Sequence, residues 1–234
     1  MRKKVASIVL ALIGCVVIVG CGKTDNNEIR KADSKVTTES EKDVEFEYEI
    51  SDIDGENYKI HIYSGSEESV VIPDEYEEKL VVEVDNHAFS NTQMKKVQLG
   101  SNVQIIGEYA FSSNPNLKEV VFDDKLKEIK EFAFLHSGLT GNVVIPDSVE
   151  TIGTSAFGLT KVNSVEFGTG IKYIAGGAFT GDTDLKKVTF NNMDVEFEDE
   201  TVFTECSNLT IIAPKGSTAE NYACLLYTSD AADE

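Results

Sequence analysis

A pair of apolar residues recurs along the chain at an almost constant interval. Five copies read Ala-Phe and the sixth reads Val-Phe, and successive phenylalanines lie 22, 23, 23, 22 and 24 residues apart. A unit of this length cannot bury its apolar face alone, so such units stack and share one core. We therefore predict a column of buried rings, formed by Phe89, Phe111, Phe134, Phe157, Phe179 and Phe203.

Further apolar positions keep a fixed offset from each pair. The unit reads V-x-x-I-x-x-x-A-F, followed after five or six residues by L-x-x-V-x-[IF]. The alternation in V-x-[IF] is typical of a strand, and the residues around Ala-Phe favour a short helical or 3-10 turn. The pattern predicts a β-rich solenoid of repeats of about 23 residues over 70–223, with a continuous strand ladder along one face. Two departures are Glu198, where Ile is expected, and the loop at 137–141.

The residues between the inward positions of L-x-x-V-x-[IF] should point to solvent. They form a mixed polar surface with two exposed valines, and repetition aligns such residues into an extended face suited to large ligands. The alternative is a sheet face that is merely soluble. The candidate binding face consists of Lys96, Gln98, Glu119, Val121, Asn142, Val144, Ser164, Glu166, Lys187 and Thr189.

Segments on both sides of the repeats are candidates for caps. Residues 44–69 contain two alternating apolar stretches, 46–50 and 58–62, separated by the turn signal Asp54-Gly55. This pattern predicts a β-hairpin, and a solenoid needs such a cap over its first core layer. At the other end, residues 216–223 resemble the short helix that commonly follows the last repeat in solenoids of this kind.

The amino terminus has the order of features of a secretory signal. A basic start is followed by an apolar run that ends at Gly20-Cys21, which resembles a bacterial lipobox. We expect residues 1–20 to be a lipoprotein signal peptide and Cys21 to receive the lipid. An uncleaved anchor is the alternative, and Cys15 fits the lipobox less well because its apolar run is shorter. Residues 21–43 are polar and charged, so we expect a flexible tether.

The last eleven residues, 224–234, do not continue the repeat. Back-translation of Cys-Leu-Leu-Tyr-Thr-Ser-Asp-Ala-Ala-Asp resembles a transposase-type sequencing adapter read in frame. We therefore expect this segment to be an artefact and the natural chain to continue differently after Ala223. The alternative is an ordinary frayed terminus.

Charge and composition exclude some functions. With 21 Lys and Arg against 41 Asp and Glu, the formal charge is −20, so nucleic acid is not an expected partner. Cys206 is the one cysteine expected in the folded part, and we interpret it as a small buried residue.

No catalytic, cofactor or metal site is expected. His61, His87 and His136 lack metal-ligand spacing and are interpreted as surface residues. Asp52–Glu56 faintly resembles a calcium loop but lacks its final bidentate glutamate, so a hairpin turn is favoured. The acidic run Glu196–Glu200 is interpreted as a solvated face.

The repeats resemble a known family. Val103–Phe111 and Pro146–Phe157 are similar to BspA-type leucine-rich repeats, and Cys206 stands where that family often has Cys before Asn-Leu. The resemblance implies a lipid-anchored cell-surface protein for adhesion to an extracellular protein or glycan, held at the membrane through Cys21. A structural spacer that presents a domain beyond Ala223 is the alternative. An enzyme would need residues that the sequence does not offer.

Overall fold

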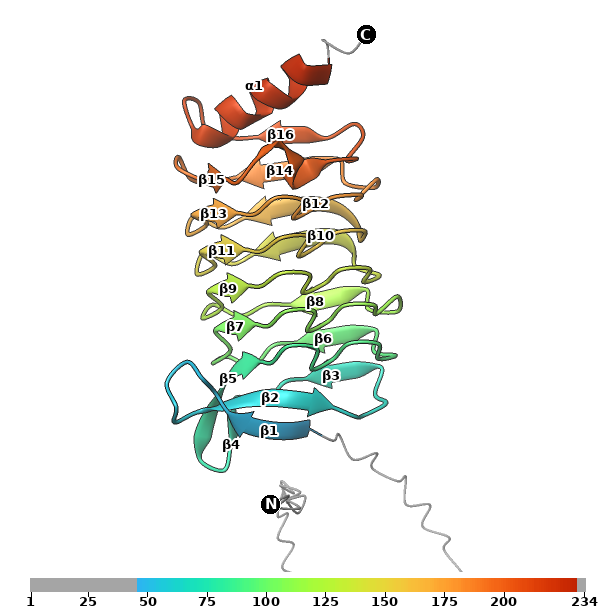
Figure 1. Ribbon diagram of the computed structural model, residues 1–234, viewed down its shortest axis with the longest axis vertical. Helices are drawn as coiled ribbons and strands as arrows, with labels where there is room; N and C mark the ends of the chain where they lie inside the picture. The colour runs from blue at the N-terminus through green and yellow to red at the C-terminus, as the bar shows by residue number, and fades with distance from the viewer. Residues whose placement is uncertain (1–45, 231–234) are drawn as a thin grey trace, which may run out of the picture. The chain divides into compact units, whose positions relative to one another are not determined.

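The computed structural model describes residues 46–230, with side chains described up to residue 226. These residues wind into stacked coils, one coil per sequence repeat (Figure 1). The predicted signal peptide, Cys21 and the tether lie outside the described residues. No helix in the described part is long and apolar enough to span a membrane.

The elements are short strands with one helix at the end. They are β1 (Phe46–Ile50), β2 (Tyr58–Tyr63), β3 (Ser69–Val71), β4 (Glu75–Tyr76), β5 (Lys79–Val84), β6 (Lys96–Gln98), β7 (Ile105–Ile106), β8 (Glu119–Val121), β9 (Glu128–Ile129), β10 (Thr140–Ile145), β11 (Thr151–Ile152), β12 (Lys161–Phe167), β13 (Tyr173–Ile174), β14 (Lys187–Phe190), β15 (Glu196–Phe197), the 3-10 helix η1 (Glu200–Phe203), β16 (Thr210–Ile212) and α1 (Thr218–Asp230).

Each coil contributes a strand to each of two ladders. The first ladder runs β1-β2-β5-β7-β9-β11-β13-β15 without interruption, parallel except for the antiparallel hairpin β1–β2, and β4 pairs with β5 at its side. The second ladder consists of two sheets, β3-β6-β8 and β10-β12-β14-β16. The continuous second ladder expected from the sequence is therefore wrong at one step, between β8 and β10.

The break coincides with the irregular loop noted in the sequence. Strand β10 starts at Thr140, with a left-handed Gly141 at φ +75° and a register irregularity between Gly141 and Asn142. Below it, Val120 and Phe122 are only half-buried, although most inward residues of the other coils are buried. The second ladder is therefore interrupted between β8 and β10, where a backbone hydrogen bond from Thr140 N to Lys118 O (3.3 Å) remains.

The phenylalanine column is confirmed. The six predicted rings are 0–5% exposed. Neighbouring rings stack with centroid distances of 5.0, 5.2, 5.1, 5.2 and 5.5 Å. Burying each ring contributes about 1.5–3 kcal/mol. The column is therefore a main source of cohesion between coils.

Most of the turns that carry the core phenylalanines are hydrogen-bonded turns and not α-helix. In the second unit, Ala110 N donates to Gly107 O (3.2 Å) and Ser112 N donates to Tyr109 O (3.1 Å), which makes consecutive hydrogen-bonded turns. Only the last unit forms a 3-10 helix, η1, whose first turn is capped by Asp199. Phe111 N also donates to Ala133 O of the next coil at 2.8 Å, so a backbone hydrogen bond joins the turns of neighbouring coils.

A β-hairpin caps the first coil, as predicted. Its register shifts so that Tyr48 pairs with Ile60 and Glu47 with Ile62, which leaves His61 as a bulged residue. A bulge reverses the facing of the residues that follow it. For this reason Tyr63 is buried and stacks on Phe89 at 4.9 Å, while Ile62, expected to point inward, is 42% exposed.

Helix α1 covers the last coil. Ala219 and Tyr222 are buried, and the Tyr222 ring stacks on Phe197 at 4.1 Å. The helix predicted at 216–223 begins at Thr218 and continues to Asp230. Helix formation does not test the adapter origin of residues 224–234, which stays a prediction.

Two register predictions in the last coil are wrong. Ile174 pairs with Phe197, not with Glu198, because this unit is one residue longer and the strand moves accordingly. Val188 pairs with Ile211, so Ile212, predicted to point inward, faces solvent. Phe197 and Ile211 thus fill the inward apolar positions of the last coil in place of Glu198 and Ile212.

Candidate binding face

The solvent side of the second ladder carries the predicted face. None of its ten residues is buried. Strand pairing aligns them in two columns, since Lys96 pairs with Glu119 and Gln98 with Val121. Beyond the break the columns continue as Asn142, Ser164 and Lys187, and as Val144, Glu166 and Thr189. The structure therefore brings together four of the residues below the break and six above it.

Few of these side chains are committed to one another. Lys96 Nζ lies 2.7 Å from Glu119 Oε1, and Ser164 Oγ donates to Asn142 Oδ1 at 2.8 Å. Exposed contacts of this kind contribute about 0–1 kcal/mol, so they do not fix the surface. The face is free to exchange these contacts for those of a ligand.

The face extends by one residue at each end beyond the ten predicted residues. Val71 pairs with Gln98, and Ile212 pairs with Thr189, so both extend the second column. Val71, Ile212 and Val144 are 59%, 45% and 54% exposed, respectively. Val71 precedes the first complete repeat unit. The L-x-x-V spacing from Leu209 predicts an inward position for Ile212. An alignment of each strand with its neighbour in the next coil is the signal that finds them.

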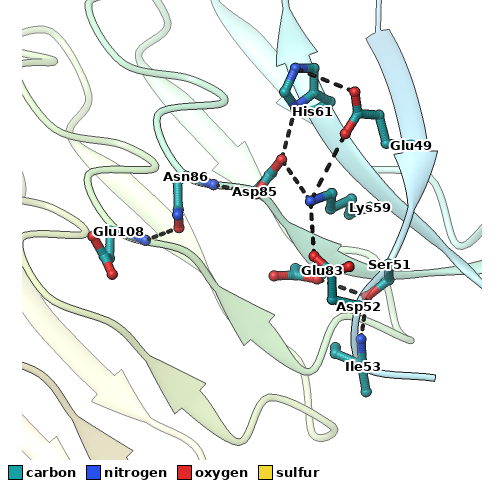
Figure 2. Close-up of polar contacts among 10 residues, drawn as sticks. All are labelled: Glu49, Ser51, Asp52, Ile53, Lys59, His61, Glu83, Asp85, Asn86 and Glu108. Atoms are coloured by element: carbon teal, nitrogen blue, oxygen red, sulfur yellow. Dashed lines mark hydrogen bonds and ion pairs between the residues drawn. The ribbon is translucent and has the colours of Figure 1, made fainter. Parts of the chain in front are cut away.

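A polar cluster joins the cap hairpin to the first coil (Figure 2). His61 Nδ1 lies 2.8 Å from Asp85 Oδ2, and its Nε2 lies 3.6 Å from Glu49 Oε1. Lys59 Nζ lies 3.1 Å from the same Asp85 oxygen and 3.5 Å from Asp52. The bulge at His61 aims this ring at Asp85, which is why strand alternation alone did not predict the cluster.

The neighbours of Asp85 in this cluster favour its ionised form. Burial opposes ionisation of Asp85, but hydrogen bonds from His61 and the Asn86 N–H, together with the Lys59 ammonium, lower the pKa of its carboxyl. Glu49, His61 and Asp85 bring three potential metal-ligand atoms within 4.8 Å of one another. The Lys59 ammonium already lies against Asp85, so the arrangement works as an ion-pair clamp for the cap.

The other candidates of the sequence have structural contacts. Asp54 Oδ1 accepts from the N–H groups of Glu56 and Asn57, both at 2.9 Å, so Asp52–Glu56 forms a hairpin turn. In the acidic run, Glu198 Oε2 accepts from Gly176 N at 2.7 Å and Asp199 caps η1.

Cys206 and the histidines also have defined places. Cys206 is half-buried, its Sγ donates to Phe179 O at 3.1 Å, and burial raises the pKa of its thiol to about 12. It is therefore an inert packing residue at neutral pH. His87 and His136 are exposed. The ring of His87 stacks on Tyr109 at 4.9 Å.

A model of the BspA type leucine rich repeat region matches residues 81–218 with six copies. The chain belongs to this family. The BspA-type repeats of the chain thus cover most of the coils and both columns of the candidate face. This family is a repeat scaffold and indicates no enzyme activity.

Solved structures show the same fold. A T. pallidum leucine-rich repeat protein, TpLRR, is 27% identical with a TM-score of 0.55, and the match covers 77% of this chain and 92% of that one. The pneumococcal vaccine antigen PcpA is 22% identical with a TM-score of 0.60, covering 73% of this chain and 41% of that one. At this identity the second likeness shows the fold alone. A comparison with curated proteins gives no match.

Proposed function

We propose that this BspA-type repeat protein is a cell-surface binding module that recognises an extracellular protein or glycan through the face of its second ladder. The observation that carries the proposal is the alignment of residues that are not buried into two columns along the solvent side of the second ladder, with the exposed apolar residues Val71, Val144 and Ile212 spaced along one of them. Repetition of the columns suits contact with an extended ligand.

Attachment to the membrane is part of the same proposal. The basic start, the apolar run and Cys21 support a lipid anchor, and the polar segment 22–43 supplies a tether. Growth with a labelled fatty acid should label the full chain, and Cys21→Ser should abolish the label and release the protein into the medium. Retention of the label in the Cys21→Ser variant would contradict lipidation at this residue.

The binding role is tested with intact cells that display the full chain. Adherence is measured to surfaces coated with mucin, fibronectin or collagen. The double change Val144→Lys and Glu166→Lys should lower adherence about tenfold, because it introduces charge at the centre of the face. Met193→Lys is the matched control, since Met193 is 47% exposed and lies outside both columns.

The result separates binding from a spacer role. If the face variant and the Met193 variant adhere as the wild type does, the second ladder is not the binding face. If cells that display the chain adhere to none of the coats better than cells that lack it, a spacer role for the solenoid is favoured.

A further inference from the structure

A second exposed feature lies on the turns, away from the second ladder. His87, Tyr109 and Phe132 each stand two residues before a core phenylalanine, in three successive coils. Their rings stack with centroid distances of 4.9 and 4.7 Å and interplanar angles of 4° and 18°. His87 is exposed, and the other two are half-buried. We refer to these three residues as the aromatic column.

The backbone conformation at the aromatic column costs conformational free energy. His87, Tyr109 and Phe132 have φ values of +60°, +55° and +59°, in the left-handed region. This region costs a residue with a side chain about 1–2 kcal/mol. Ser155 and Gly177 occupy the same position in the next two coils with φ of +49° and +66°. The turn of each of these coils therefore has this backbone conformation whether or not it carries a ring, so the coil does not require the three rings of the aromatic column and they are available for recognition.

The column has an open end. Above Phe132, the side chains at the corresponding position are the hydroxymethyl group of Ser155 and the hydrogen of Gly177, which are too small to cover a ring. Among the described residues, Tyr109 is the one aromatic partner of Phe132. An incoming planar group can therefore continue the stack on the outer face of Phe132.

Exposed glutamates precede two of the rings in the sequence. Glu108 precedes Tyr109 and Glu131 precedes Phe132, and both are exposed. Figure 2 shows Glu108 held by its backbone N–H, which donates to Asn86 Oδ1 at 2.7 Å, with its carboxylate directed away from the cap cluster. The chain as a whole has a formal charge of −20. A partner for this strip is therefore cationic as well as planar.

We propose that the aromatic column is a docking strip for an arginine-containing basic segment of a partner protein. A guanidinium group stacks on the outer face of Phe132 and pairs with Glu131. Arginine fits both requirements, because its planar cation stacks on aromatic faces and forms two parallel hydrogen bonds to a carboxylate. Lysine meets only the charge requirement. This surface is separate from the second ladder and goes beyond the proposed function.

The test is a titration of the full chain with acetylated peptides that alternate glycine with arginine, lysine or glutamate. The arginine peptide should bind, the lysine peptide about threefold to tenfold more weakly, and the glutamate peptide not at all. Binding should weaken with added salt, because the pair with Glu131 is exposed. Equal affinity for arginine and lysine would overturn the stacking part of the proposal.

Variants decide whether the column itself binds. Phe132→Ser gives this coil the residue that Ser155 already provides in the next one, so the fold should persist, as checked by circular dichroism. It should weaken the arginine peptide about tenfold, and Glu131→Gln should weaken it about threefold.

Asp124→Asn is the matched control, because it removes one exposed charge far from the column in its coil. Unchanged affinity in Phe132→Ser, or an equal loss in Asp124→Asn, overturns the proposal in favour of general attraction to an acidic protein. The Val144→Lys and Glu166→Lys variant should bind the arginine peptide normally, so failure here is distinct from failure of the proposed function.

Discussion

Two coils place different groups at the same buried position, three residues after their core phenylalanine. Asn114 donates through Nδ2 to Phe89 O and Phe111 O at 2.8 and 2.9 Å, and its Oδ1 accepts from Thr92 N and Oγ1. Asp182 accepts from Thr160 N and Oγ1 but has no hydrogen to donate when ionised. Both residues are fully buried.

The difference teaches how a repeat tolerates a buried charge. An amide satisfies donors and acceptors at any pH, whereas a carboxyl group does so only when protonated. Burial, partly offset by the hydrogen bonds from Thr160, raises the pKa of Asp182 to about 7. The Asn114 coil should therefore be insensitive to pH, and the Asp182 coil should be sensitive near neutrality.

The largest effect is expected from Phe134, one of the two core rings between these two coils. Phe134 stacks on Phe111 and on Phe157 at the step where the second ladder is broken. Phe134→Ala should lower the free energy of unfolding by about 3–5 kcal/mol and separate denaturant unfolding into two transitions. Phe132→Ala, at a half-buried ring of the aromatic column, is the control and should cost less than about 1.5 kcal/mol. A single transition with a small loss would contradict this role for Phe134.

Asn114→Asp should make the stability of the Asn114 coil depend on pH, as that of the Asp182 coil does. The change removes both amide hydrogens from Phe89 O and Phe111 O and buries a charge at high pH. We expect a loss of about 2–4 kcal/mol at pH 8, partly recovered at pH 5. Urea unfolding at the two pH values measures it, and an equal loss at both would show that protonation does not compensate.

Asp182→Asn should instead stabilise the protein at high pH, and the change should be smaller than the loss in Asn114→Asp. The folded-state pKa of Asp182, about 7, exceeds its ordinary value of 3.8, so its proton favours the fold. The wild type therefore loses stability as pH rises from about 4 to 7, and the variant should gain about 2 kcal/mol over it at pH 8 and little at pH 5. The neighbouring Asp184 side chain and the uncharged Cys206 thiol are present in both proteins. A constant difference at both pH values would contradict titration of Asp182.

The core of the fold could be predicted from the sequence, because stacking imposes one period on all coils. The spacing of Phe89 to Phe203 sufficed for the ring column. A single inserted residue has a local effect that a period cannot locate, which is why the spacing points to Glu198 and Ile212 at the positions that Phe197 and Ile211 occupy. The Asp85 cluster also escaped prediction, since it depends on the bulge at His61. Asn114 and Asp182, in contrast, hold equivalent positions that an alignment of the repeats reveals.

The break between β8 and β10 has a mechanical consequence. In a stack where each coil contacts only its neighbours, resistance to stretching is set by the weakest interface. At this one step β8 and β10 form no strand pair, so the load falls on the first ladder, the turns and the ring stack, together with the bond from Thr140 N to Lys118 O. Tension applied along the stack would part the solenoid here first, leaving both halves wound.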